Sequence, residues 1–342
     1  MRLLGVICVL AAACGGAQPG VPPRSPAETE LAAAIDDFYW PHLAFRPSFA
    51  VDLGYHQYDG KVPDRSPAAL QAELQRLHAA RARLDKIDAR ALPALQQVER
   101  EVVLAEIRRE LFDLEVRRRP WREPFWYLRG FSLNPYVARP YAPLAQRMIG
   151  LLAACEAAPT YYQQADANLE PVLSKPALQV GLMMTGGAID FVEHDLRAEL
   201  PALADADLRG RTEACLDRLA DALTAFKEAL GKRMPQATDD FALGADGLLA
   251  MLRESEGIEI DLATLQRIAQ ADLARNQQAL AAAAAEIDPG KPVAEVVAHV
   301  SADKPPAREV LTEARAQVES LRLFVLDHHI VSVPREEIAE VR

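Results

Sequence analysis

The seven histidines are the first residues to test for catalytic chemistry, because a helical zinc peptidase binds its metal through this side chain. Such a site needs two histidines one helical turn apart, with a glutamate after the first to activate the metal-bound water. No two histidines of this chain have that spacing and that neighbour. They are His42, His56, His78, His194, His299, His328 and His329. We therefore predict that the chain itself binds no metal or other cofactor and has no catalytic residue.

Three of these histidines have polar or histidine neighbours and need a closer look. His194 lies between Glu193 and Asp195, on a helix that otherwise has ordinary solvated charge, so we interpret it as a surface residue. His328 and His329 are adjacent and must point to different faces, so we do not expect them to chelate one ion. We expect one of the two imidazoles to cap backbone carbonyls of the preceding helix.

Motifs for nucleophilic and phosphate chemistry are also missing. No Gly-x-Ser-x-Gly sequence occurs, so the chain has no candidate nucleophilic serine of the α/β-hydrolase type. The stretch Gly181–Gly187 is rich in glycine, but it lacks the Lys-Ser/Thr ending and the preceding strand that cradle a phosphate. We interpret it as a place where helices pack closely or where one helix is interrupted, near Gly186 and Gly187.

One segment has residue types that suit recognition of a peptide. Between Pro120 and Pro143, five prolines and many aromatic residues predict an ordered connection without regular structure. A guanidinium and phenols in this segment are suited to bind a peptide carboxylate. The candidate contacts are Arg129, Asn134, Tyr136, Arg139 and Tyr141. The alternative, which the sequence favours, is that these side chains only pack the connection, since most aromatic residues in such places are core.

The elements that must position these residues are helices. Apolar residues recur at three- and four-residue steps along most of the chain, which is typical of amphipathic helices. We therefore predict an all-α fold, a large multi-helix array with at most one short strand, at Ile330–Val333. Helices are expected to begin at Ser25, Ser66 and Pro93, where capping residues or prolines occur. Further helices are expected over residues 144–155, 161–173, 177–196, 208–230, 262–280 and 306–325.

The N-terminus has the form of an export signal. Residues 3–13 are an apolar run too short to span a bilayer, and the sequence leading into Cys14 resembles the lipobox of bacterial lipoproteins. We predict a signal peptide at 1–13, a flexible tether at 14–26 and a helical domain at 27–342. Acylated Cys14 would anchor the protein to a lipid bilayer on the periplasmic side of the cell envelope. The alternative, since Ala11 replaces the usual leucine, is cleavage near Ala13 to a free soluble protein.

The charge of the chain argues against a nucleic acid partner, and its cysteines leave open whether one disulfide forms. The formal net charge is −11 and no basic stripe occurs, so we do not expect a nucleic acid partner. The basic run Arg117–Arg119 suits the negative end of a helix dipole. Cys155 and Cys215 fall on apolar helical positions, which favours two core thiols; a disulfide between them is the less favoured alternative.

Several phrases of the sequence jointly resemble a bacterial family called domain of unknown function 885, from about Leu31 to Arg342. They are Ala50–Gly54, Asp64–Leu70, Asn134–Leu144, Leu262–Asn276, Ile287–Pro292 and Asp303–Pro305. Members of that family look like zinc metallopeptidases of the helical gluzincin type. Their metal motif lies C-terminal to the part that this chain matches, so none of their metal or catalytic residues can be transferred to it. The resemblance thus implies zinc and a peptide substrate only for a longer protein.

Two functions follow as hypotheses. The first is that the chain is the helical body of an exported zinc-metallopeptidase-like lipoprotein, cut short at Arg342 and inactive alone. The second is a non-catalytic envelope lipoprotein that binds a peptide or protein partner through its helical surface. Under the first hypothesis, helical faces that should pack on absent residues would be exposed apolar patches, and we expect them to promote aggregation.

Overall fold

The computed structural model describes residues 24–333 and 341, and within them the chain is all-α, as predicted. No strand forms in this part of the chain, and residues 330–333 are irregular rather than extended in a sheet. One isolated bridge joins Ser174 and Thr238. The chain divides into two compact units, Met1–Glu259 (unit 1) and Ile260–Arg342 (unit 2). The predicted signal peptide and Cys14 lie outside the described residues, and the predicted domain boundaries stay a prediction.

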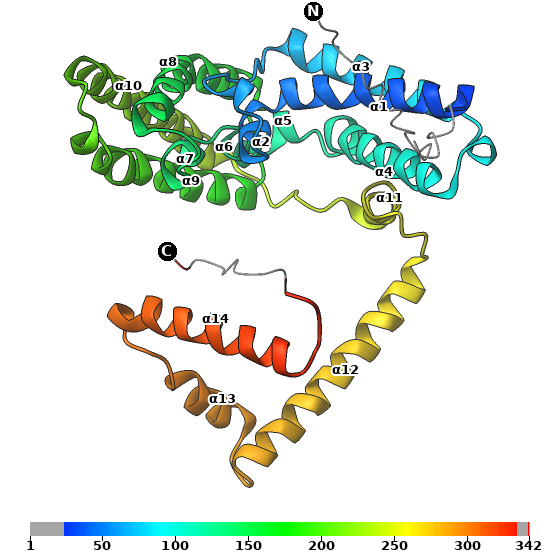
Figure 1. Cartoon of the computed structure of the whole chain (residues 1–342). Helices are drawn as coiled ribbons and strands as arrows, with labels where there is room; N and C mark the ends of the chain where they lie inside the picture. Colours follow the sequence, from blue (N-terminus) through cyan, green and yellow to red (C-terminus); the bar gives the residue numbers. More distant parts are fainter. Residues whose placement is uncertain (1–23, 334–340, 342) are drawn as a thin grey trace, which may run out of the picture. The chain divides into compact units, whose positions relative to one another are not determined.

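The first, third and fourth helices of unit 1 form one packed group (Figure 1), and the second buries Ala50 and Val51 in a separate small cluster. Their bounds are α1 Pro26–Phe45, α2 Pro47–Asp52, α3 Pro67–Asp85 and α4 Ala94–Leu111. At the start of α1, the Ser25 N–H donates to Glu28 and the Glu28 N–H donates to the Ser25 hydroxyl, which completes the predicted capping box. Leucines spaced by helical turns, such as Leu77 and Leu84, are fully buried between these helices.

Three long helices form the second group of unit 1: α8 Leu144–Asn168, α9 Lys175–Asp190 and α10 Ala206–Arg233. Cys155 of α8 and Cys215 of α10 are joined by a disulfide across this core, with their Cα atoms 6.2 Å apart. The interpretation as two free thiols was therefore wrong. Both cysteines are apolar core positions, as expected, but helical spacing on separate helices says nothing about which core positions face each other.

The proline-rich segment is more regular than predicted. It folds as three short helices, α5 Arg119–Arg122, α6 Pro124–Gly130 and α7 Asn134–Ala138. Each has a proline in one of its first two positions, where the missing N–H and the fixed φ angle favour a helix start. The prolines thus divide the segment into single helical turns rather than exclude helix.

The glycine-rich stretch packs closely but does not interrupt its helix. A Cβ atom on Gly181 of α9 would lie 2.8 Å from Cβ of Pro124, so α6 approaches α9 at this glycine. Helix α9 continues past Gly186 and Gly187, with no break, and passes into a π-helical turn, η4 (Phe191–Leu196). The predicted close packing is confirmed, and the predicted interruption was wrong, because each glycine costs a helix only about 1 kcal/mol, which tertiary packing can offset.

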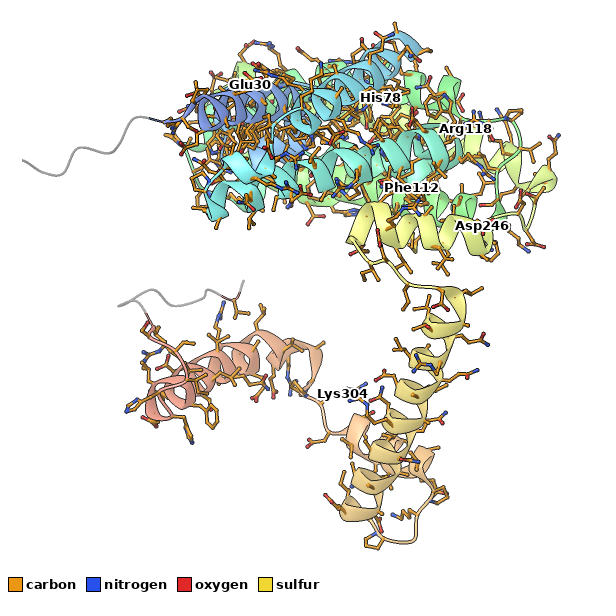
Figure 2. All side chains as sticks on the ribbon, turned by 90° about the vertical axis from the view of Figure 1, so that its right-hand side faces the viewer. Glu30, His78, Phe112, Arg118, Asp246 and Lys304 are labelled. Atoms are coloured by element: carbon orange, nitrogen blue, oxygen red, sulfur yellow. A yellow bond between two sulfur atoms is a disulfide. The ribbon has the colours of Figure 1, made fainter. Side chains whose placement is uncertain are left out.

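Helix α11 (Gly244–Glu256) completes unit 1 by packing against α4 and the π-helical turn that extends it, η3 (Phe112–Val116). Figure 2 shows Phe112 on the side of this turn that faces α11. The remaining short turns of the described chain are η1 (His56–Tyr58), η2 (Ala89–Ala91), η5 (Leu200–Ala202), η6 (Met234–Gln236) and η7 (Ala307–Glu309).

Unit 2 consists of α12 (Leu262–Ile287), α13 (Val293–Ala302) and α14 (Val310–Asp327). In its described part only Ala284 and Val296 are fully buried. Large apolar side chains of all three helices are exposed. They include Leu262, Ile268, Leu273, Leu280, Ile287, Val297, Val300, Val310, Leu311, Leu321, Leu323, Phe324 and Leu326. At the end of α14, the rings of His328 and His329 lie 3.0 and 2.8 Å from backbone carbonyls, which confirms the predicted cap.

No helix among the described residues is long and apolar enough to cross a membrane.

Candidate functional site

The five candidate contacts come from α6, α7 and the turn after it, but they do not converge on one point. Tyr136 is buried, and its hydroxyl accepts a hydrogen bond of 2.8 Å from the Gly60 N–H. Burial raises the pKa of Tyr136, so its hydroxyl stays protonated. Gly60 has a φ of +77°, and a Cβ there would lie 2.8 Å from Cβ of Ala153. The Tyr136 hydroxyl therefore stabilises the loop that contains Gly60, where the positive φ and the lack of space suit only glycine.

Tyr141 holds the same loop at its other end. Its hydroxyl donates to Oδ2 of Asp59 at 3.0 Å, and its ring is stacked on His56 with centroids 3.6 Å apart. Nδ1 of His56 lies 3.3 Å from Oδ1 of Asp59. Burial, followed by the hydrogen bond to Asp59, raises the pKa of Tyr141. An imidazole beside a carboxylate has the parts of a general base, but neither residue lines any of the pockets described below.

Arg129 and Arg139 lie on the surface. The Arg139 guanidinium donates to the backbone carbonyl of Asp52 and lies 3.7 Å from that residue's carboxylate, so a ligand carboxylate would compete with Asp52. Arg129 lies over the ring of Phe125, 5.6 Å from its centroid. Neither guanidinium is buried, and an exposed ion pair of this kind contributes little binding energy.

Asn134 lies at a pocket of about 290 Å³ in unit 1, called here the Asn134 pocket. Its walls come from α6, α8, α9, η4 and α10, and Figure 1 shows the four α-helices gathered around α7. The lining residues are Leu128, Phe131, Ser132, Leu133, Asn134, Tyr162, Met184, Ala188, Phe191, Val192, Leu219 and Leu223. All but Ser132, Asn134 and the Tyr162 hydroxyl are apolar, so the pocket suits an apolar group with a few polar contacts at one edge.

Some hydrogen-bonding groups of the residues that line the Asn134 pocket have no protein partner within residues 24–333. Within residues 24–333, the Asn134 side-chain amide makes no hydrogen bond to protein. Phe131 is extended, with φ −133° and ψ 126°, and its N–H makes no bond to the end of α6. In that same part of the chain, the carbonyls of Phe131 and Ser132 accept no backbone N–H. Solvent or a ligand must satisfy these groups.

A second pocket, of about 380 Å³, lies beside the start of α9. Its cationic groups are already paired: the Arg117 guanidinium donates to Glu123 at 2.8 Å, and Arg122 lies 3.8 Å from Asp240. Because both arginines already have carboxylate partners, we expect this pocket to bind an anion only weakly.

A network of charges joins Arg46, at the end of α1, to α3, α4, η3 and α5, and no sequence pattern predicted it. It alternates arginines with carboxylates, and Glu73, Glu110 and Asp113 are almost fully buried within it. Its members are Arg46, Glu73, Arg76, Glu106, Arg109, Glu110, Asp113, Arg117, Arg119 and Glu123. The close spacing of glutamates and arginines in residues 106–123 was the available signal, but it is also typical of a solvated helix.

Arg117 and Arg119 of the basic run belong to this network, so the interpretation of the run as helix-dipole cations was incomplete. Arg118 has a φ of +53°, and this left-handed residue turns the chain back on itself. Arg117 and Arg119 then reach the same two carboxylates, Asp113 and Glu123. Arg118 instead pairs with Glu170 at 2.9 Å.

Among residues 24–333 and 341, no cluster of three or more histidine, cysteine, aspartate or glutamate side chains is arranged to bind a metal ion. The buried carboxylates of the network face arginines, which compete with any cation. His194 is exposed, and its Nδ1 lies 3.0 Å from Asp190, as expected for a surface residue.

Comparisons with known proteins show a family and a fold. The family described as "Bacterial protein of unknown function (DUF885)" matches residues 47–342. A solved structure titled "The structure of a putative lipoprotein of unknown function from Shewanella oneidensis" is similar, with a TM-score of 0.67 and 18% sequence identity. The similarity covers 91% of this chain and 59% of that one. No curated protein has significant sequence similarity to this chain.

Proposed function

This chain belongs to the DUF885 family of bacterial proteins of unknown function, and from that premise we propose that it is the helical scaffold of a larger exported lipoprotein. In this proposal the larger protein is metallopeptidase-like, and its zinc and catalytic residues lie outside residues 1–342. The chain contributes stability and part of the wall of a peptide site. Acylated Cys14 anchors the protein on the periplasmic side of the envelope.

One observation carries this proposal: unit 2 has amphipathic helices but almost no core. Leu321 and Phe324 lie three residues apart on one face of α14, and they are 63% and 50% exposed. Soluble proteins rarely leave contiguous apolar faces open to water, and such faces usually mark an interaction surface. The similarity in fold is consistent with further polypeptide on this surface, since the similar solved structure is matched over only 59% of its length.

The disulfide supports the exported location. Cys155 and Cys215 are paired in the core of unit 1, and disulfides persist in oxidising compartments such as the bacterial periplasm rather than in the cytosol. Substituting Cys14 with alanine should abolish labelling by a radioactive fatty acid and release the protein from the membrane fraction. Unchanged labelling of Cys14→Ala would contradict the anchor.

The test of the catalytic part of the proposal compares two proteins: residues 24–342, and the product of the complete reading frame. We expect the complete product to bind about one zinc ion per chain and to hydrolyse peptides, and residues 24–342 to do neither. Stoichiometric zinc in residues 24–342, or a complete product without zinc, would contradict the proposal.

A second candidate function is peptide binding without catalysis, and the Asn134 pocket favours it. If the complete product binds peptides but lacks zinc and hydrolytic activity, this second function replaces the first.

A further inference from the structure

We propose that the Asn134 pocket binds one apolar side chain of an extended peptide, whose backbone pairs with Phe131 and with the Asn134 side chain. This inference shares with the proposed function only the idea that the ligand is a peptide. It requires neither zinc nor catalysis. It assigns the pocket a ligand class, an aliphatic or aromatic side chain, and it assigns the pocket's edge a role in holding the ligand backbone.

The walls of the pocket specify an apolar occupant. Phe131, Leu219 and Leu223 belong to the buried core of unit 1, and Met184 and Ala188 contribute from α9. A charged side chain placed against these residues would lose its hydration without gaining a partner. The volume of about 290 Å³ lies at the lower end of the range for ligand pockets, which suits a single side chain better than a large ligand.

The residues at the edge of the pocket suit hydrogen bonding to the backbone of a bound peptide. Phe131 is extended, and neither its N–H nor its carbonyl has a backbone partner within residues 24–333. An extended peptide residue can exchange two hydrogen bonds with such a residue, as in strand addition. The Asn134 amide, also without a protein partner in that range, supplies one donor group and one acceptor beside it.

The same edge disfavours the other apolar occupant, a fatty acyl chain. An acyl chain has no amides along its length, so it would cover Phe131 and Asn134 without satisfying their polar groups. Leaving such groups unpaired costs binding energy, whereas a peptide satisfies them.

The π-helical turn η4 explains why a pocket exists at this place. Phe191 and Val192 begin η4, directly after α9, and both line the pocket. A π-turn adds a residue to the helical repeat and is often found at functional sites. Here η4 packs against α10, so the altered helical repeat brings Phe191 and Val192 to the wall of the pocket.

The experiment measures binding of acetyl-Ala-Leu-Ala-amide and acetyl-Ala-Asp-Ala-amide to the whole chain by NMR titration. We expect the leucine peptide to bind at least about tenfold more tightly than the aspartate peptide. Ala188→Phe fills the pocket and should weaken the leucine peptide at least about tenfold. The matched control is Met183→Phe, because Met183 is on the same helix, is 70% exposed and does not line the pocket.

A second variant keeps the test decisive if Ala188→Phe does not fold. Asn134 is exposed and its side chain makes no hydrogen bond within residues 24–333, so Asn134→Ala should fold normally and weaken the leucine peptide several-fold. Dodecanoate serves as the acyl probe. Binding of dodecanoate but not of the leucine peptide, binding of neither, or leucine-peptide binding that survives both variants would each overturn the inference. Zinc content and hydrolysis are not used, so its failure is separate from failure of the proposed catalysis.

Discussion

His42 makes the stability of this fold depend on pH below 7. Its Nδ1 lies 3.2 Å from an Arg46 guanidinium nitrogen, which only donates, so Nδ1 accepts and the ring is neutral. Burial, followed by the charge of Arg46, lowers the pKa of His42 to about 4. A histidine with a lowered folded-state pKa stabilises the fold above its unfolded pKa of about 6.5 and loses that contribution as the pH falls towards 4.

We therefore expect the free energy of unfolding to fall by about 3 kcal/mol between pH 7 and pH 4 on account of His42. Urea unfolding at a series of pH values measures this loss, and His42→Gln should flatten the curve in that range. Glu73 acts in the same direction at lower pH, because Arg76 and Arg46 outweigh burial and lower its pKa. Glu110 has the opposite effect: burial raises its pKa, so its contribution to the free energy of unfolding grows as the pH falls. An equally steep curve for His42→Gln would assign the acid sensitivity to the carboxylates.

Arg65 is a buried cation that has no anionic partner among residues 24–333. It is 2% exposed, and its guanidinium lies between the rings of Phe45 and Trp126, 4.1 and 4.5 Å from their centroids. Its Nε and Nη1 have no hydrogen-bond partner within the described part of the chain. Stacking on two rings is favourable, but burying an incompletely paired charge is costly, so the two effects oppose each other.

Arg65→Met keeps much of the packed volume and removes the charge, so we expect its free energy of unfolding to lie within about 1 kcal/mol of the original. Arg65→Ala leaves a cavity between the two rings and should cost about 2–4 kcal/mol. Both values come from urea denaturation. If Arg65→Met is as destabilising as Arg65→Ala, the charge itself stabilises the fold.

At the scale of elements, the sequence predicted well where helices begin, but it predicted poorly which residues of different helices lie in contact. The Ser25 and Ser66 caps are local signals that involve residues three apart, and both helices begin there. Whether Cys155 faces Cys215 depends on how two helices pack, which no local pattern encodes. The Asn134 pocket was found only in part for the same reason: Asn134 was a candidate from its own segment, but its walls come from helices up to about ninety residues away.

Contact between α6 and α9 depends on one glycine and can be tested against another. Gly181 faces Pro124, and an added methyl group would lie 2.8 Å from its Cβ; Gly187, on the same helix, has nothing within 4 Å. Gly181→Ala should destabilise the protein by about 1–3 kcal/mol through overpacking. Gly187→Ala should stabilise it by up to about 1 kcal/mol, because alanine favours helix. Thermal unfolding of both variants measures this contrast. An equal change in stability for the two variants would show that α6 moves to make room for the added methyl group.

At the scale of the whole molecule, the two units differ in what stabilises them. Unit 1 has three clusters of buried apolar residues and a disulfide, so it has the interior of an independently stable domain. The described part of unit 2 buries only Ala284 and Val296 completely. In proteins most helical stability comes from tertiary packing of an apolar face, so the stability of unit 2 has to come from contacts that cover its apolar faces.

The exposed faces of unit 2 predict self-association of residues 24–342 in the absence of a covering partner. Leu321 and Phe324 lie on one face of α14, so replacing both with glutamine removes a contiguous part of the apolar surface without disturbing a core. We expect the original chain to bind a hydrophobic dye and to elute as large species whose share grows with concentration, and the double variant to do both much less. Leu95→Gln is the control, because Leu95 is 70% exposed on α4, in the other unit. A monodisperse monomer that unfolds cooperatively and binds no dye would mean that unit 2 covers its own apolar faces in solution, and the proposal of a scaffold for further polypeptide would lose the observation that carries it.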